Sequence, residues 1–332
     1  MPDTIIIVDQ EERTEVQLPK SWNELTLDQQ LAAYGIIFEN SPDVLAPQEV
    51  LPAKRLSLFL LLSGKEENFL HQWQSDCRQA EENDDDGDTV FLSELDECLS
   101  STNLFFKQNE EKGNAYEINF ALTRCPWPEM AGVPSHFKHI KSTITWHAPA
   151  FDEDTADGLS NINLYELANT FTLFERMVTE KDLKMKERLV QRLLCTLYRP
   201  VKPETPENIE CGYNGDIRQP LEGFETMIKK RQPHWKFIPA PAKQLLIFWF
   251  ASCRKYIIEQ YPLVFKPPKG EKQNGNDFGW GGVLLELAGG LPQLQKVYKQ
   301  PYQNGLIYLS RLEDQAIRRE LEEKKRRLKK IR

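Results

Sequence analysis

Three short motifs in this sequence contain residue types that do chemistry in other proteins. The first is Asp277-Phe278-Gly279, the tripeptide that holds magnesium in protein kinases. A kinase also needs a glycine-rich phosphate loop and a His-Arg-Asp catalytic loop upstream, and the sequence contains neither. The local pattern instead predicts a helix that Asn276 or Asp277 caps and that Gly289-Gly290 ends. Its three glycines cost roughly 1 kcal/mol each in a helix, which close packing or a hinge would explain.

The second motif is an acidic segment, residues 83–94, which imitates a calcium-binding loop. An EF-hand places glycine at loop position 6 and a bidentate glutamate at position 12. If Gly87 is position 6, then position 12 is Ser93, and Glu94 comes one residue late. The spacing therefore favours an exposed acidic loop, while the density of carboxylates leaves weak calcium binding open.

The third motif is His136-x-x-His139, which has His147 and Cys125 nearby. Pro134 argues against a helix that would place both imidazoles on one face, and no Asp or Glu completes a zinc ligand set at standard spacing. The motif is more typical of surface or packing histidines. The sequence also lacks Gly-x-Ser-x-Gly, His-Glu-x-x-His and the P-loop. We therefore expect no catalytic, cofactor-binding or metal-binding residues and no enzyme activity, although a site assembled from distant residues stays open.

Composition limits the class of protein. The chain has 332 residues, of which 40% are hydrophobic, enough for one large or two ordinary domains. Its six cysteines form no Cys-x-x-Cys pair, which favours reduced thiols over a disulfide framework. The N-terminus has no signal-peptide pattern, and the longest apolar runs, 56–62 and 245–251, are shorter than the roughly 20 residues of a membrane span. These features predict a soluble, cytoplasmic protein that does not enter a membrane.

Charge is unevenly distributed along the chain. The formal net charge is -8, yet residues 311–332 contain ten Lys or Arg and only five Asp or Glu. Lys324–Arg332 has seven basic residues in nine. One interpretation is a solvated helix end whose cations suit the helix dipole; the other is an anchor onto an acidic partner or a phosphate backbone.

The hydrophobic periodicity predicts a mainly α fold with two small β-hairpins, one N-terminal and one around 103–122. Thr26 and Gln29 form a capping-box pattern at the start of the first helix. We also expect helices over 52–64, 66–80, 92–99 and 242–261, two helices within 163–199, and C-terminal helices after 278. We expect an N-terminal α+β region over 1–150 and a C-terminal helical region with a basic tail over 151–332, and whether 200–236 is a boundary stays open.

Several segments of the C-terminal half resemble a known group of proteins. They are Asn161–Asn169, Leu197–Pro200, Trp249–Arg254, Tyr261–Phe265 and the glycine-containing helix at 278–290. This arrangement resembles proteins encoded in phage and prophage tail-gene regions and, more loosely, tail assembly chaperones. Those are mainly helical proteins that coat the tape-measure protein during assembly. The resemblance implies a non-enzymatic role that depends on surfaces.

Partner binding is therefore the function we expect, with a helical, tape-measure-like protein as the partner. A thin apolar row on 309–321 would suit association of helices. The alternatives are a structural neck or baseplate component that self-associates, and a nucleic-acid-binding accessory protein that uses the basic tail. The residues expected to contact a partner are aromatic or basic: Trp280, Tyr298, Tyr302, Lys324, Lys325, Arg326, Arg327, Lys329 and Lys330. The three aromatic residues could equally belong to the core.

Overall fold

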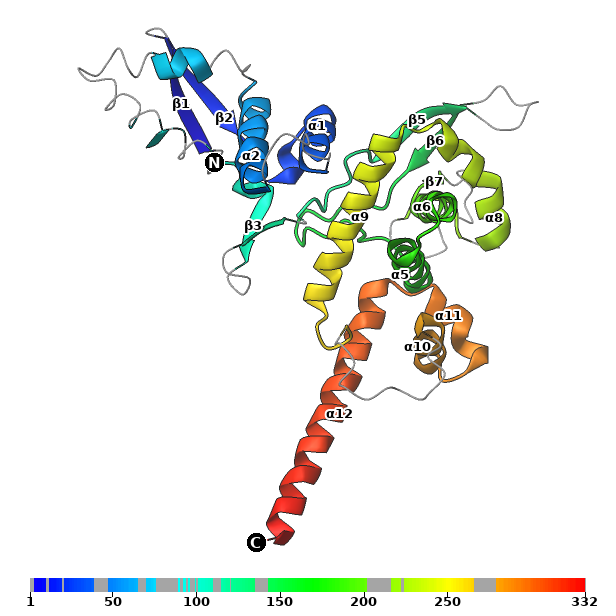
Figure 1. Cartoon of the computed structure of the whole chain (residues 1–332). Coiled ribbons are helices and arrows are strands. Elements are labelled where there is room, and N and C mark those ends of the chain that lie inside the picture. The colour runs from blue at the N-terminus through cyan, green and yellow to red at the C-terminus, as the bar shows by residue number, and fades with distance from the viewer. Residues whose placement is uncertain are drawn as a thin grey trace. The chain divides into compact units, whose positions relative to one another are not determined.

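The computed structural model describes most of the chain and divides it into two compact units, Met1–Leu122 and Thr123–Arg332 (Figure 1). The described residues are 3–9, 12–19, 21–38, 47–64, 70–75, 101–109, 115–119, 121–134, 143–201, 216–221, 224–265 and 279–331, with the single residues 89, 92, 93, 95 and 99. The fold is mainly helical, as the sequence predicts. Both predicted hairpins are present as well.

The first unit combines two hairpins with helices. In order along the chain its elements are β1 (Asp3–Asp9), β2 (Glu12–Leu18), η1 (Trp22–Glu24), α1 (Leu27–Phe38), α2 (Pro47–Ser63), η2 (Ser101–Leu104), β3 (Phe106–Asn109) and β4 (Ala115–Ile118). Strand β1 pairs antiparallel with β2, and β3 pairs antiparallel with β4.

Local sequence signals set the helix ends of this unit. The backbone N–H of Thr26 donates to Gln29 Oε1 at 3.0 Å, and the N–H of Gln29 donates to Thr26 Oγ1 at 3.3 Å, so the predicted capping box forms. Helix α2 ends at Gly64, whose φ of +67° suits glycine. The rings of Trp22 and Phe105 meet edge to face at 4.8 Å in the core of this unit.

The second unit contains a small sheet and most of the helices. Its elements are β5 (Glu129–Pro134), β6 (Thr143–His147), α5 (Leu164–Thr179), α6 (Leu183–Leu197), β7 (Arg199–Pro200), α8 (Phe224–Arg231), η4 (Gln232–Phe237), α9 (Ala240–Gln260), α10 (Gly279–Leu287), η5 (Leu291–Gln293), α11 (Leu294–Tyr298) and α12 (Tyr302–Ile331). The antiparallel sheet has the order β5-β6-β7. The sequence did not predict this sheet, because β5 is interrupted by a register shift and β7 is only two residues long.

Helices α5, α6 and α9 build the core of the second unit. The N–H of Glu166 donates to the side chain of Asn163 at 2.8 Å and so caps α5, while Asp182 caps α6. Helix α9 is the strongly apolar helix that the sequence predicts, and Trp249 and Phe250 in it are fully buried. The indole N–H of Trp249 donates to the carbonyl of Thr123 at 2.9 Å.

The boundary between the units differs from the expected division at 150. Residues from Thr123 onward belong to the second unit, because this segment forms hydrogen bonds with other parts of that unit. Besides the bond from Trp249 to Thr123, β6 pairs with β7 through Trp146 and Pro200. Part of the segment 200–236, which the sequence left open as a boundary, lies outside the described residues. Residues 83–88 of the acidic segment and both His136 and His139 also lie outside them.

The glycine-containing helix begins at Gly279, so its proposed caps, Asn276 and Asp277, lie outside the described residues. Its predicted end is confirmed: Gly289 and Gly290 have φ values of +60° and +126°. A Cβ on Gly281 would meet nothing within 4 Å, so close packing does not explain this glycine.

Candidate functional site

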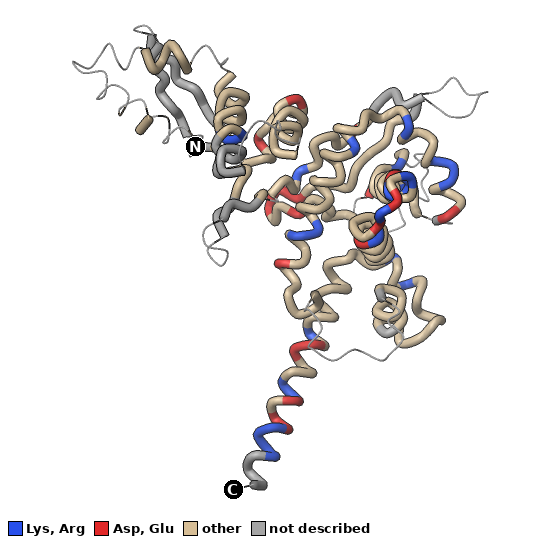
Figure 2. Tube along the Cα trace, in the orientation of Figure 1, with Lys and Arg blue, Asp and Glu red and all other residues tan. Residues whose placement is uncertain are grey.

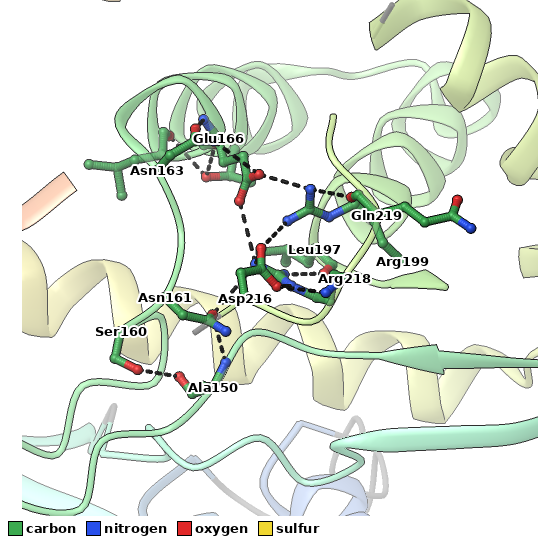
Figure 3. Close-up of polar contacts among 12 residues, drawn as sticks. Ala150, Ser160, Asn161, Asn163, Glu166, Leu197, Arg199, Asp216, Arg218 and Gln219 are labelled. Atoms are coloured by element: carbon green, nitrogen blue, oxygen red, sulfur yellow. Dashed lines mark hydrogen bonds and ion pairs between the residues drawn. The ribbon is translucent and has the colours of Figure 1, made fainter. Parts of the chain in front are cut away.

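A buried ionic cluster lies between the start of α5 and the segment that follows β7 (Figure 3). It consists of Glu166 on α5, Arg199 in β7, and Asp216 and Arg218 beyond it, and their side chains are at most 2% exposed. Arg199 Nη1 lies 2.8 Å from Glu166 Oε1, and Arg199 Nη2 lies 3.1 Å from Asp216 Oδ2. Arg218 Nε lies 2.7 Å from Asp216 Oδ1, and Arg218 Nη2 lies 3.4 Å from Glu166 Oε2. Each guanidinium group therefore contacts both carboxylates.

The electrostatics of the cluster are those of a charge-balanced core network. Burial on its own would raise the pKa of Asp216, but Arg218 and Arg199 outweigh it and hold this pKa below its ordinary value of 3.8. Burial and the neighbouring Arg199 lower the pKa of Arg218. Two guanidinium groups face two carboxylates, so the formal charges of the cluster balance within the core.

Hydrogen bonds from the same cluster join segments that are distant in sequence. Arg218 Nη1 donates to the carbonyl of Leu197 at 2.7 Å, and Arg199 Nη1 donates to the carbonyl of Gln219 at 2.7 Å. Asn161 accepts from the N–H of Ala150 at 2.8 Å and from Arg218 at 3.5 Å. The cluster thus fixes the chain on both sides of α5 and α6, and we interpret it as structural.

The described cysteines are buried thiols. Burial raises the pKa of Cys125 to about 12, although hydrogen bonds with Tyr198 and Trp127 partly oppose this effect. Burial also raises the pKa of Cys195 and of Cys253. Since the thiolate is the nucleophile, these three thiols are held in their unreactive form. The Cys125 thiol, part of the His136 motif in the sequence, lies 3.0 Å from the Tyr198 hydroxyl.

The described residues contain no group of three or more His, Cys, Asp or Glu side chains that could hold a metal ion. In that same part of the chain, none of the helices has both the length and the apolar character that a membrane span requires.

A polar recess of about 580 Å³ lies where α12 begins. Its lining residues are Ala150, Phe151, Asp152, Ser160, Asn161, Pro301, Gln303 and Asn304. The hydroxyl of Ser160 donates to the carbonyl of Ala150 at 3.0 Å, and Gln303 Nε2 donates to the carbonyl of Ser160 at 2.9 Å. The Ser160 hydroxyl and the Gln303 amide are therefore engaged in hydrogen bonds that hold the first turn of α12 in place.

The first turn of α12 is firmly anchored to α5. The backbone N–H of Leu164 donates to the carbonyl of Gln300 at 2.9 Å, and that of Tyr302 donates to the carbonyl of Ile162 at 3.3 Å. A Cβ on Gly305 would lie 2.7 Å from a methyl group of Leu164, so the two helices approach closely at this point. Leu306 is fully buried beside them.

Beyond this anchor α12 extends away from the other helices of its unit (Figure 2). Its outer turns alternate basic and acidic side chains, and Asp314 pairs with Arg318 at 2.9 Å. Every described side chain from 307 to 327 is at least partly exposed. The exposed large apolar side chains are Ile307, Tyr308, Leu312 and Leu321, at 42%, 53%, 37% and 51%. Tyr308, Leu309, Leu312 and Ala316, at spacings of three and four residues, therefore form an at least partly exposed apolar row on one side of this helix.

The structure places the predicted contact residues in different environments. Trp280 is partly buried, with its ring centroid 5.8 Å from that of Phe171, and Tyr298 packs against Tyr165 at 4.7 Å. Tyr302 is only 1% exposed and belongs to the core, the alternative that the sequence left open. The four basic residues Lys324–Arg327 are exposed, while Lys329 and Lys330 lie outside the residues whose side chains the structure describes.

Sequence reasoning missed both the ionic cluster and the recess. The one local signal for the cluster was Arg199, which directly follows the apolar stretch Leu193–Tyr198. Comparisons of the chain with protein-family models, with curated proteins and with solved structures found no match.

Proposed function

We propose that this chain is a non-enzymatic binding protein that uses the exposed side of α12 to dock onto a helical partner. The specific setting we propose is the cytoplasmic assembly of a phage-like tail, with a tape-measure-like protein as the partner. The setting comes from the resemblance of the C-terminal half to tail-region proteins. The docking surface itself is supported by the exposure of α12.

The observation that carries the proposal is the contrast within α12. Tyr302 and Leu306 at its start are buried, whereas Leu312 and Leu321 further along are 37% and 51% exposed. Leu309, Leu312 and Ala316 follow one another at spacings of three and four, as do the anchor residues of a helix that lies in a groove. Covering this row with a partner helix would remove its apolar surface from water.

The helix does not need this apolar row for its own stability. Glu320, Glu322 and Glu323 each precede Lys or Arg by four residues, an orientation that supports an isolated helix by about 0.2–0.5 kcal/mol per pair. The basic end also suits the negative end of the helix dipole. An apolar row on a helix already supported by charge pairs is best explained by contact with another molecule.

The basic end of α12 adds a preference for acidic partners. Lys324–Arg327 are exposed and lie C-terminal to the apolar row. Their charge would steer an acidic helix onto the apolar row and raise its association rate. The same cations favour the nucleic-acid alternative, which predicts affinity that falls steeply with salt.

The test is co-purification of the tagged full-length chain from its native host, with mass spectrometry of the retained proteins after nuclease treatment. We expect a long, helix-rich protein to be retained by the natural chain and lost with Leu309→Gln and Leu312→Gln combined. Glutamine preserves helix propensity and charge while removing the apolar contact.

The matched control combines Val178→Gln with Ile217→Gln, which changes apolar side chains that are 59% and 55% exposed outside α12. This control should retain the partner. Equal loss with both variants, or retention of nucleic acid alone without nuclease, would contradict helix docking. Large assemblies of the purified chain alone, measured by light scattering, would instead support the structural-component alternative.

A further inference from the structure

A basic groove runs between α6, α8 and η4, on elements other than α12. Its volume is about 620 Å³. The lining residues are Leu183, Lys184, Glu187, Arg188, Gln191, Lys229, Gln232, Pro233 and Lys236. Four of these side chains are cationic and one is anionic, in a chain whose formal net charge is -8. The groove is therefore locally positive, although the whole chain is negatively charged.

The amphipathic character of the surrounding helices directs these cations outward. In α6, Leu189 and Leu193 are buried, so Lys184 and Arg188 lie together on the exposed side, four residues apart. In α8, Ile228 is 1% exposed, and its neighbour Lys229 is exposed. The groove is thus formed by core packing that leaves basic side chains at the surface.

The charge of the groove is available to a ligand. Within the described residues, the side chains of Lys184, Arg188, Lys229 and Lys236 form no ion pair and no hydrogen bond. The anionic lining residue, Glu187, is already engaged, since it lies 2.5 Å from Lys243 Nζ and accepts from Gln191 at 2.9 Å. An acidic ligand would therefore meet four uncompensated cations and one neutralised carboxylate.

From this geometry we infer that the groove binds an acidic peptide segment that also carries an apolar side chain. Carboxylates would pair with Lys184, Arg188 and Lys229, with the strongest contact at the planar guanidinium. Leu183, which is 79% exposed, and Pro233 offer apolar contact beside the charges. The described lining contains no aromatic ring on which a nucleic-acid base could stack, which favours a peptide over a single-stranded nucleic acid.

This site does not depend on the proposed role of α12. The groove lies on α6, α8 and η4, whereas the apolar row lies beyond the first turns of α12. The substitutions Leu309→Gln and Leu312→Gln should therefore leave peptide binding in the groove unchanged. Failure of one proposal can be distinguished from failure of the other.

The test measures fluorescence anisotropy of a labelled peptide of alternating Asp-Glu and Leu residues with the full-length chain. A labelled oligothymidine is the comparison ligand. We expect the peptide to bind, with affinity that falls as salt rises, and the combined substitution Lys184→Glu and Arg188→Glu to weaken it by about tenfold or more.

The matched control is Lys181→Glu with Lys186→Glu, which makes the same charge change at exposed positions outside the groove lining. It should weaken binding far less than the groove variant, and circular dichroism should show both variants folded. The inference is overturned if the natural chain does not bind the peptide, if both variants lose affinity equally, or if oligothymidine binds more tightly than the peptide.

Discussion

The hydroxyl of Tyr302 donates a hydrogen bond to a carboxylate oxygen of Asp157, and the two oxygens are 2.5 Å apart. The other Asp157 oxygen accepts from the backbone N–H of Leu159 at 2.9 Å, so a loop before α5 holds the first residue of α12. Gln303 Nε2 donates to the same carboxylate oxygen as Tyr302, at 3.1 Å. This contact sets the point from which α12 extends.

Replacing Tyr302 with Phe should weaken that attachment. The substitution keeps the buried ring but removes the donor to Asp157, a loss of about 1–3 kcal/mol in the free energy of unfolding. Urea unfolding followed by circular dichroism measures the change. Tyr308→Phe is the matched control, because Tyr308 is 53% exposed, and it should change the stability by less than about 0.5 kcal/mol. Equal effects would contradict an anchoring role for Tyr302.

The same contact predicts a dependence on alkaline pH. Burial and the nearby Asp157 raise the pKa of Tyr302 above its ordinary value of 10.0. Its contribution to stability is therefore complete below pH 10.0 and declines as the pH rises above that value, where the unfolded chain ionises first. As the pH rises from neutral to about 11, the free energy of unfolding should therefore fall less for Tyr302→Phe than for the natural chain.

The buried ionic cluster should tolerate the loss of one carboxylate poorly. Asp216→Asn leaves two buried guanidinium groups with a single carboxylate, which should cost about 3–5 kcal/mol. Asp314→Asn makes the same substitution in the exposed pair with Arg318 and should cost less than about 1 kcal/mol. Thermal unfolding of the two variants compares them directly.

Acid should remove the difference between the natural chain and Asp216→Asn. Because the pKa of Asp216 is held below 3.8, its stabilising contribution is present above that pH and is lost as the pH falls through its lowered pKa in the folded state. The stability gap between the two chains should therefore be largest near neutral pH and shrink below pH about 4. A gap that is constant across this range would contradict an ionic role for Asp216.

Two glycines should respond to alanine in opposite directions. A Cβ on Gly158 would lie 2.0 Å from the carbonyl oxygen of Thr123 and 2.5 Å from Cys253 Sγ, so Gly158→Ala should destabilise by about 1–3 kcal/mol or more. Gly281 has open space around it within α10, and Gly281→Ala should stabilise by roughly 1 kcal/mol. Denaturant midpoints of the two variants measure the direction of each change in stability. A Gly158→Ala variant as stable as the natural chain would contradict the close approach of Gly158 to Thr123.

The buried thiols should resist alkylation in the folded protein. With iodoacetamide at pH 8, peptide mapping should find Cys125, Cys195 and Cys253 almost unlabelled, because burial raises the pKa of each thiol. The same peptides should be labelled fully in guanidinium chloride. Rapid labelling of Cys125 in the folded chain would show that a reactive thiolate exists at this position.

Much of the fold could be predicted because its signals are local. The capping box of Thr26 and Gln29, the glycines that end α2 and α10, and the apolar run of α9 each lie within a few neighbouring residues. Backbone hydrogen-bonding requirements and helical periodicity act at that range. The mainly helical class and both hairpins followed from such signals.

The candidate sites could not be predicted in the same way. The ionic cluster pairs Arg218 with Glu166, 52 residues earlier, and only the tertiary fold brings the two together. Strand β7 contains just two residues, too few for an alternating pattern. The basic groove combines Lys184 with Lys229 and Lys236 from elements that carry acidic residues as well, so no run of charge reveals it.

The central claim is that the exposed side of α12 is a binding surface for a helical partner. Hydrogen–deuterium exchange of the full-length chain, alone and with the co-purified partner, tests this claim most directly. The outer turns of α12, residues 307–327, should exchange faster in the free chain than the buried helix α9, because the side chains of the outer turns are at least partly exposed to water. Partner binding should slow exchange in the outer turns most strongly. Protection confined to other elements, with the outer turns unchanged, would contradict the account.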